Sequence, residues 1–142
     1  MVEKDKIKKI YISWKEVEEL VDTLHKNILE SGKEFTHICG IPRGGLTPAI
    51  MLSHKMRIPY HSLSERHPHN ETLFVDDICD SGETLQNLYE YYTAVLHYKP
   101  HTSKYEPRYY ACKFESNDWI VYPWENKDSK PIQDYKVMVG KN

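Results

Sequence analysis

The stretch LFVDDICDSGETL, residues 73–85, constrains the fold more than any other part of the 142-residue chain. It joins an apolar run, typical of a buried strand, to a turn with glycine and hydroxyl residues that opens a helical segment. Three carboxylates lie at the junction, those of Asp76, Asp77 and Asp80. A strand that turns directly into a helix is a βα unit, so the stretch favours an α/β fold built on a parallel sheet.

The rest of the chain repeats this alternation of strands and helices. Ser13 and Glu16 form a capping box that predicts a helix start, and Gly32 predicts its end. Further helices are expected over residues 46–56 and 81–92, and strands over residues 9–14, 35–41, 58–63, 72–78 and 94–99. The pattern predicts an α/β fold, with a mainly parallel central sheet flanked by helices.

Beyond residue 100 the chain becomes rich in aromatic residues and proline, with one strand expected near residues 109–114. This composition predicts a small C-terminal hood on the sheet rather than another βα unit. We expect a single domain over 1–142, with a core at about 7–100, a hood at about 101–130 and a tail at 131–142. The tail carries a possible short strand, DYKVMVG.

Composition narrows the class of protein. The net charge of −2 gives no basic excess of the kind that nucleic-acid binding requires, so no nucleic-acid partner is expected. No apolar run approaches the roughly 18 residues of a membrane span, and the start does not resemble a signal peptide. The three cysteines are an odd number without CxxC spacing, which predicts neither disulfides nor a zinc site. A cytoplasmic protein is expected.

The two halves of residues 73–85 suit different chemical groups. Backbone N–H groups at a glycine turn that opens a helix bind phosphate, and neighbouring hydroxyls add donors. The residues that supply these groups are Asp80, Ser81, Gly82, Glu83 and Thr84. Asp76 and Asp77 would repel phosphate but accept hydrogen bonds from vicinal hydroxyls, so the expected ligand is a ribose 5-phosphate. A plain N-capped turn is the alternative, and it explains one of the three acidic residues.

Residues 75–85, VDDICDSGETL, resemble the signature of the type I phosphoribosyltransferases: an apolar strand, two acidic residues, two spacers, Asp, a small hydroxyl residue, Gly, any residue and Thr. Residues 40–46, GIPRGGL, resemble the pyrophosphate loop of the family's 6-oxopurine members, which often contains a cis peptide. On this resemblance, Arg43 and Gly44 hold pyrophosphate. An ordinary turn is the alternative for the second motif.

Two further segments resemble bacterial xanthine-guanine and hypoxanthine phosphoribosyltransferases, and the resemblance covers about residues 11–125. AVLHYKP resembles the strand whose terminal lysine, here Lys99, donates to the purine 6-oxygen; a lysine that snorkels to solvent is the alternative. WIVYPWE resembles the hood that holds the base. There Trp119 would stack on the purine and backbone groups near Ile120 would bind its edge, while Trp124 is expected to pack in the protein.

The resemblance implies an enzyme that transfers a 5-phosphoribosyl group from phosphoribosyl pyrophosphate to guanine, xanthine or hypoxanthine. Asp80 would act as general base or acid at the purine N7. Asp76 and Asp77 would hold the ribose hydroxyls, and Asp77 would hold Mg²⁺ partly through ligand and water. A homodimer or homotetramer is implied, for which the aromatic run at residues 89–92 offers a surface.

The chain departs from the family in the loop at residues 62–71, which is short and lacks the usual Ser-Tyr pair. In the family, closure of this loop keeps water from the reaction. A neighbouring subunit could supply the lid, or the lid could be reduced. Two alternatives follow: a regulatory protein that binds phosphoribosyl pyrophosphate or nucleotide without catalysis, and an enzyme for another base or for nucleotide hydrolysis. In the same region, phosphate contact by Arg66 or His67 is expected over a zinc site at His61, His67 and His69.

Overall fold

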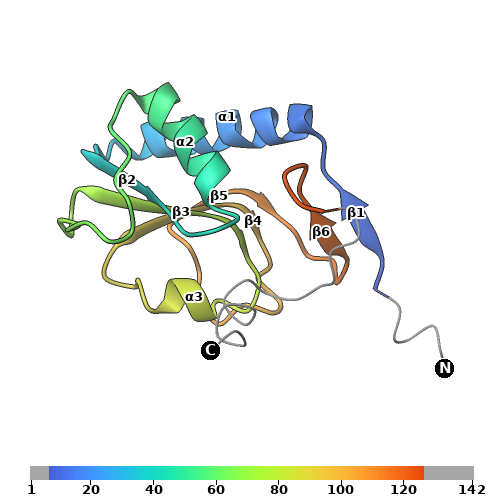
Figure 1. Cartoon of the computed structure of the whole chain (residues 1–142). Coiled ribbons are helices and arrows are strands. Elements are labelled where there is room, and N and C mark those ends of the chain that lie inside the picture. Colours follow the sequence, from blue (N-terminus) through green and yellow to red (C-terminus); the bar gives the residue numbers. More distant parts are fainter. Residues whose placement is uncertain (1–6, 127–142) are drawn as a thin grey trace.

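The computed structural model describes residues 7–126. A four-stranded parallel sheet forms its centre, in the order β2-β3-β4-β5 (Figure 1). The strands are β2 (His37–Gly40), β3 (Thr72–Cys79), β4 (Tyr92–Tyr98) and β5 (Tyr109–Lys113). The predicted parallel α/β fold is confirmed. The strand expected near residues 109–114 is present as β5, but it extends the central sheet instead of belonging to the hood.

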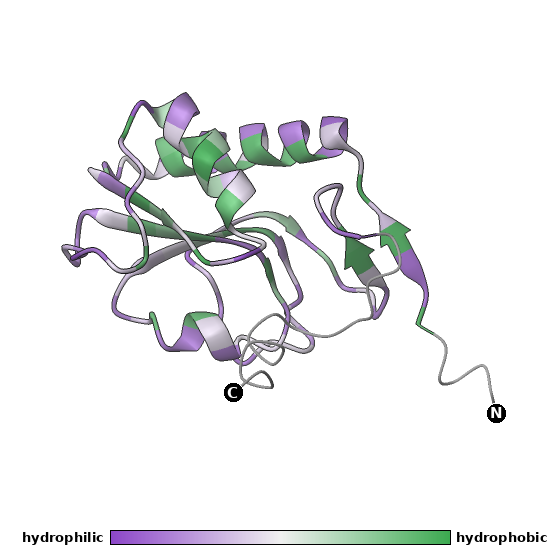
Figure 2. Ribbon diagram, viewed as in Figure 1, coloured by the Kyte–Doolittle hydropathy of each residue, from purple (hydrophilic) through white to green (hydrophobic). Residues whose placement is uncertain are grey.

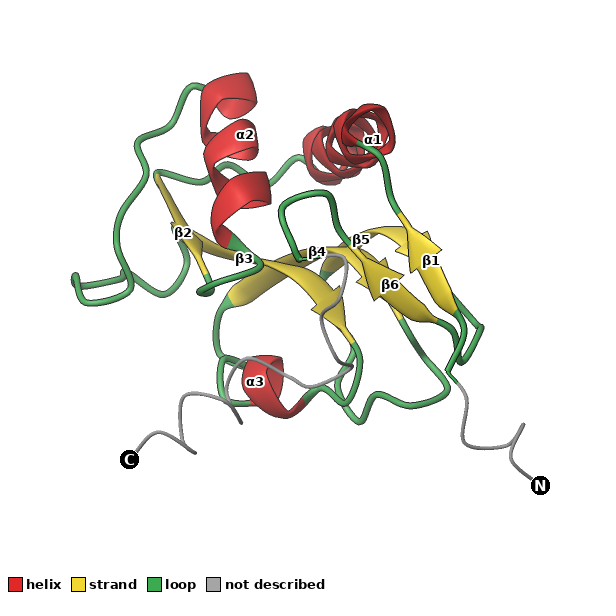
Figure 3. Ribbon diagram, turned by 45° about the vertical axis from the view of Figure 1, so that its right-hand side comes forward, coloured by secondary structure: helices red, strands yellow, loops and turns green. Residues whose placement is uncertain are grey.

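Two helices, α1 (Trp14–Ser31) and α2 (Leu46–Met56), cover one face of the sheet, and the short α3 (Glu83–Gln86) lies on the other (Figures 1 and 3). The capping box predicted for α1 is formed. The Ser13 hydroxyl accepts from the Glu16 N–H at 3.1 Å, and the Glu16 carboxylate accepts from the Ser13 N–H at 2.9 Å. Gly32 ends the helix with a left-handed φ of 76°, a conformation that costs glycine nothing.

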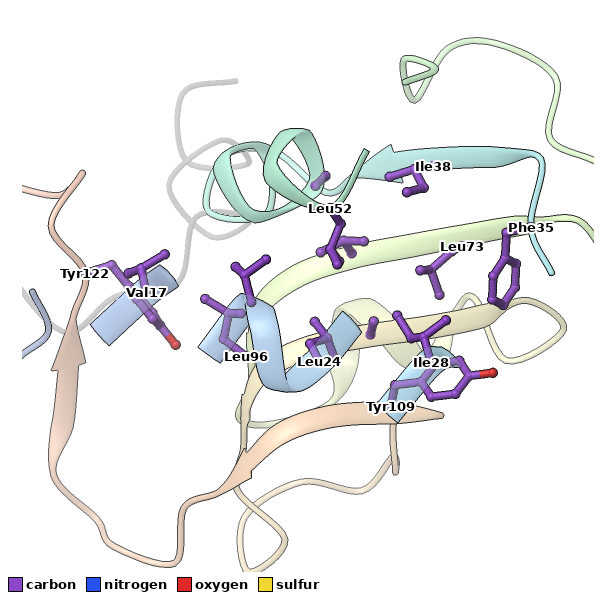
Figure 4. Packing of buried hydrophobic residues seen from close by; sticks show 14 of the residues in the cluster. Val17, Leu24, Ile28, Phe35, Ile38, Leu52, Leu73, Leu96, Tyr109 and Tyr122 are labelled. Carbon is purple, nitrogen blue, oxygen red and sulfur yellow. The ribbon is translucent and has the colours of Figure 1, made fainter. Parts of the chain in front are cut away.

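The main core lies between α1 and the sheet, and Figure 4 shows its packing. Apolar residues recur every three to four positions along α1 and form one stripe that faces the strands. All members of this stripe are fully buried. These members are Val17, Val21, Leu24 and Ile28. Figure 2 shows the same division, with apolar positions of both long helices turned to the sheet and polar positions turned outward. A second cluster around Phe74, Leu85 and Val95 fills the α3 side.

Two predicted elements are reduced to a single helical turn and a single bridge. The helix expected over residues 81–92 is reduced to the four residues of α3, because Leu85 and Leu88 anchor the turn to the sheet and Tyr92 already begins β4. The strand expected over residues 58–63 makes a single bridge, between Tyr60 and Ile38. Pro59 has no N–H to donate to a longer ladder.

The aromatic run at residues 89–92 is not one exposed surface, which is a correction to the sequence-based expectation. Tyr91 packs edge-on against Phe74 at 4.8 Å, and Tyr92 packs against Phe35 at 5.2 Å. Tyr89 remains exposed, at 72% of its surface.

The hood contains a second, two-stranded parallel sheet, formed by β1 (Lys9–Tyr11) and β6 (Trp119–Val121), which lies beside the central sheet (Figure 3). It brings the start of the described chain against its end, and the pairing continues in a bond from the Ile12 N–H to the Val121 carbonyl. Within residues 7–126 no helix is long and apolar enough to cross a membrane. The strand expected in the tail lies outside the described residues.

Candidate functional site

The acidic pair of the first motif lies near the carboxyl end of β3. Asp76 and Asp77 are both half-buried, so a ligand can reach them. Their carboxylates are oriented by local hydrogen bonds, from the Asp77 N–H to Asp76 Oδ1 at 2.9 Å and from the Ile78 N–H to Asp77 Oδ1 at 2.7 Å. Oxygen atoms of this kind can hold hydroxyl donors or a hard divalent cation.

The second motif forms a tight loop directly beside this pair. The Ile41 N–H donates to the Val75 carbonyl at 2.8 Å, so the loop leaves β2 along β3. The peptide bond between Pro42 and Arg43 is cis. Gly44 lies so close to the Asp77 carboxylate that a Cβ on it would overlap the carboxylate oxygen. The two motifs expected to share a site are therefore in contact, and the contact requires glycine at position 44.

The phosphate-type turn follows β3 at residues 80–84. Gly82 has a φ of 83° and precedes α3, as the sequence predicts for a tight turn. A side chain at this position would meet Ser103 and Tyr105, which lie directly behind it. The Lys104 N–H donates to the Ser81 carbonyl at 3.0 Å. The segment after β4 thus supports the turn from behind, while Ser81 and Thr84 are only half-buried.

Asp80 and Lys99, which follow adjacent strands, face each other. Lys99 Nζ lies 3.9 Å from Asp80 Oδ2 and donates to the Asp118 carbonyl at 2.9 Å. Lys99 is 3% exposed, and its ammonium also lies 5.8 Å from the centre of the Phe114 ring. A buried ammonium needs such partners, since an unpaired charge in the interior is very costly. The alternative of a lysine that snorkels to solvent is therefore wrong.

The predicted base-holding residues lie on β6. Trp119 is half-buried, and its indole Nε1 is buried without a hydrogen-bond partner among residues 7–126. The Ile120 side chain belongs to the core, so only its backbone can contact a ligand. Trp124 packs as expected, because its ring stacks on Tyr122 at 4.9 Å and lies 5.9 Å from Trp14.

Comparison with solved structures identifies the fold. The chain is 27% identical to a purine phosphoribosyltransferase from Pyrococcus horikoshii, with a TM-score of 0.73 over 89% of this chain and 100% of that one. The chain therefore has the fold of the type I phosphoribosyltransferases and is similar to their purine-specific members. A xanthine-guanine-hypoxanthine phosphoribosyltransferase from Helicobacter pylori shares the fold at 21% identity, with a TM-score of 0.70 over 93% of this chain and 99% of that one.

A third neighbour, a hypothetical protein from Neisseria gonorrhoeae with bound ppGpp, is 21% identical, with a TM-score of 0.71 over 87% of this chain and 92% of that one. No family model matches the sequence. The neighbours confirm the predicted relationship to the purine phosphoribosyltransferases, the fold and the class of enzyme. The choice of base and the roles of individual residues stay predictions.

Two buried residues beside the acidic pair were missed in the sequence. The Tyr122 hydroxyl donates to the Asp77 carbonyl at 3.1 Å and lies 2.7 Å from His97 Nδ1. Because the hydroxyl hydrogen goes to the carbonyl, His97 Nδ1 carries a hydrogen and donates to Tyr122. Burial lowers the pKa of His97 to about 4, so the ring is neutral at pH 7. The only signal in the sequence was a histidine inside the apolar run of β4.

The short loop at residues 62–71 is held against the rest of the domain by His67 and by His61, which directly precedes it. His61 pairs with Glu65 at 2.9 Å and stacks on His37 at 4.0 Å. The His67 ring packs on Phe74 at 5.0 Å, and Arg66 is exposed.

The three histidines of this region, at positions 61, 67 and 69, do not converge. His69 lies against Tyr91, at 4.7 Å between ring centres, while His61 and His67 contact other partners. Among residues 7–126 no three His, Cys, Asp or Glu side chains are arranged to hold a metal ion by themselves. The three histidines named for zinc therefore do not form a zinc site in this part of the chain.

Proposed function

We propose that the protein transfers a 5-phosphoribosyl group from phosphoribosyl pyrophosphate to a 6-oxopurine, releasing pyrophosphate and a nucleoside monophosphate. The observation that carries this proposal is the buried Lys99 ammonium facing Asp80 at the ends of adjacent strands. A buried hydrogen-bond donor beside a carboxylate matches the 6-oxygen and the neighbouring N7 of an oxopurine. The likeness to the Pyrococcus horikoshii purine phosphoribosyltransferase supports the same reaction.

The phosphoribosyl donor would lie across the two turns. Residues 80–84 would take the 5-phosphate, and Asp76 and Asp77 would accept hydrogen bonds from the ribose hydroxyls. Arg43 and Gly44 would hold the pyrophosphate as it leaves. The acidic pair suits Mg²⁺, with Asp77 holding the ion partly through ligand and water, and the ion would neutralise charge on the leaving pyrophosphate.

The base would lie between the end of β4 and the hood. A lysine ammonium has three N–H donors; Lys99 directs one to the Asp118 carbonyl and faces Asp80, which leaves a donor for the 6-oxygen. Adenine carries an amine at this position, so two donors would face each other. Trp119 would stack on the ring, the Ile120 backbone would bind its edge, and Asp80 would exchange the proton at N7.

A second candidate is a regulatory protein that binds phosphoribosyl pyrophosphate or nucleotide without catalysis. The short loop favours it, because Tyr91 donates to the His67 carbonyl at 3.2 Å and the loop is fixed to the sheet rather than free to close. In the catalytic proposal a neighbouring subunit of a cytoplasmic homodimer or homotetramer supplies the missing cover.

One assay separates these candidates. The protein is incubated with phosphoribosyl pyrophosphate, Mg²⁺ and each of guanine, xanthine, hypoxanthine and adenine, and nucleotide formation is followed by chromatography. We expect nucleoside monophosphate from at least one oxopurine and little from adenine. Binding of phosphoribosyl pyrophosphate without product from any base would favour the regulatory protein. Product with adenine alone would overturn the role of Lys99 and would favour the alternative of an enzyme for another base.

A further inference from the structure

We propose that Thr102, a residue outside both sequence motifs, positions Asp80 for proton transfer to and from the purine; the inference rests on the proposed function. The Thr102 hydroxyl Oγ1 lies 2.8 Å from Asp80 Oδ1 and 2.9 Å from the Asp80 carbonyl. A carboxylate and a carbonyl only accept hydrogen bonds, so Thr102 is the donor, and its single hydroxyl hydrogen is shared between Asp80 Oδ1 and the Asp80 carbonyl. The hydroxyl thereby fixes one of the two carboxylate oxygens.

The other carboxylate oxygen, Oδ2, faces Lys99 across a gap. The distance of 3.9 Å is longer than a hydrogen bond between an ammonium and a carboxylate, which is about 2.7–2.9 Å. Opposite charges so close and so poorly exposed would draw together if the side chains were free to move. Each partner instead bonds a second group, Asp80 through its other oxygen to Thr102 and Lys99 to the Asp118 carbonyl at 2.9 Å.

This gap matches one edge of an oxopurine. The 6-oxygen and N7 are neighbours on that edge, so Lys99 Nζ could donate to the oxygen while Asp80 Oδ2 accepts the N7 proton. If the gap closed, the two groups would satisfy each other and the base would compete with an internal ion pair. Thr102 therefore keeps Asp80 available by holding its carboxylate away from Lys99.

The local fold explains how Thr102 reaches this position. The Lys99 N–H donates to the Cys79 carbonyl at 3.0 Å, which sets the end of β4 beside the end of β3. The chain then turns back, and the Lys99 carbonyl accepts from the Thr102 N–H at 3.3 Å and the Ser103 N–H at 3.0 Å. One turn thus carries both the ammonium that faces the base and the hydroxyl that restrains Asp80.

The test compares three variants with the wild type in the full chain. Thr102→Val keeps the shape of the side chain but removes the hydroxyl, and Thr102→Ser restores it. The control is His101→Gln, an exposed neighbour in the same turn that bonds Asn117 instead of Asp80. For each protein, kcat and KM for the purine, the Kd for phosphoribosyl pyrophosphate and the Tm are measured.

We expect Thr102→Val to lower kcat/KM for the purine about 10- to 100-fold, which is part of the roughly 10²–10⁴-fold that a positioned acid or base contributes. The Kd for phosphoribosyl pyrophosphate should stay close to that of the wild type, and Thr102→Ser should recover most of the activity. A wild-type rate in Thr102→Val, or equal losses in the Val and Ser variants, would overturn the proposal. So would equal losses of turnover and donor binding, which would assign Thr102 to the phosphate turn.

A crystal structure of Thr102→Val gives a readout that does not depend on activity. We expect Lys99 Nζ and Asp80 Oδ2 to close from 3.9 Å to hydrogen-bond distance. An unchanged gap would show that Thr102 does not hold it open. A wild type that forms no product with any base would refute the proposed function, whereas an active wild type with an unaffected Thr102→Val would refute only this inference.

Discussion

Replacement of Tyr122 by phenylalanine tests the contact that joins the hood to the acidic strand end. Tyr122 is 1% exposed, and its hydroxyl lies between the Asp77 carbonyl at 3.1 Å and His97 Nδ1 at 2.7 Å. The substitution removes only this oxygen and leaves the ring in place. His97 is 4% exposed, so water cannot readily replace the lost partner of its N–H.

The magnitude follows from the two groups left behind. A buried polar group that loses its partner costs about 1–3 kcal/mol. The His97 N–H should cost most of that range, and the Asp77 carbonyl less because that residue is half-buried. We therefore expect Tyr122→Phe to lower the free energy of unfolding by about 2–4 kcal/mol. Tyr11→Phe is the matched control, since Tyr11 is 55% exposed and should change stability by less than about 0.5 kcal/mol.

Urea unfolding, followed by tryptophan fluorescence, measures both variants. A double-mutant cycle with His97→Phe isolates the contact, because the loss of both polar partners costs less than the sum of the two single losses. We expect a coupling energy of about 1–3 kcal/mol between the two positions. Additive effects, or a loss in Tyr122→Phe no larger than in Tyr11→Phe, would refute the reasoning.

Three further predictions concern other parts of the molecule. Gly44→Ala should abolish measurable turnover, because its methyl group would displace the Asp77 carboxylate; equal kinetics in the variant would contradict the proposed contact. Acid should destabilise the fold between pH 6.5 and 4 by about 3 kcal/mol, since unfolded His97 binds a proton there that the folded protein does not. In His97→Gln, the free energy of unfolding measured in urea should no longer fall with pH across this range. An unchanged fall would exclude His97 as its source. Ser13→Ala should cost about 1 kcal/mol by urea unfolding through loss of the capping box with Glu16, whereas Ser13→Asp should retain most of the stability.

Local patterns in the sequence predicted the parts of the fold that depend on local interactions. The capping box at Ser13, the apolar stripe that follows it and the glycine that ends α1 are all present in the structure. The prediction of a helix over residues 81–92 was wrong. The apolar residues that suggested it belong to a short helical turn and to the start of β4. Packing of Tyr91 and Tyr92 against different aromatic partners decides between them, and no local pattern contains that information.

In the site, too, the sequence predicted the contacts within and between the motifs but not the contacts made by distant residues. The glycine and acidic residues of the two motifs are sequence neighbours, so their juxtaposition followed from the rule that parallel strands end at one edge. The bonds from Thr102 to Asp80 and from Tyr122 to Asp77 span 22 and 45 residues. Such contacts depend on how the hood and the turn after β4 fold back, so residue type alone did not indicate them.

The most direct measurement of the central claim compares turnover with donor binding in Asp80→Asn. Asparagine keeps the size of the side chain and an oxygen for the Thr102 bond at 2.8 Å, but it cannot take up the N7 proton. With the best oxopurine, we expect kcat to fall about 10²- to 10⁴-fold while the Kd for phosphoribosyl pyrophosphate changes less than about threefold. Equal losses of turnover and donor binding, or turnover at the wild-type rate, would contradict the account.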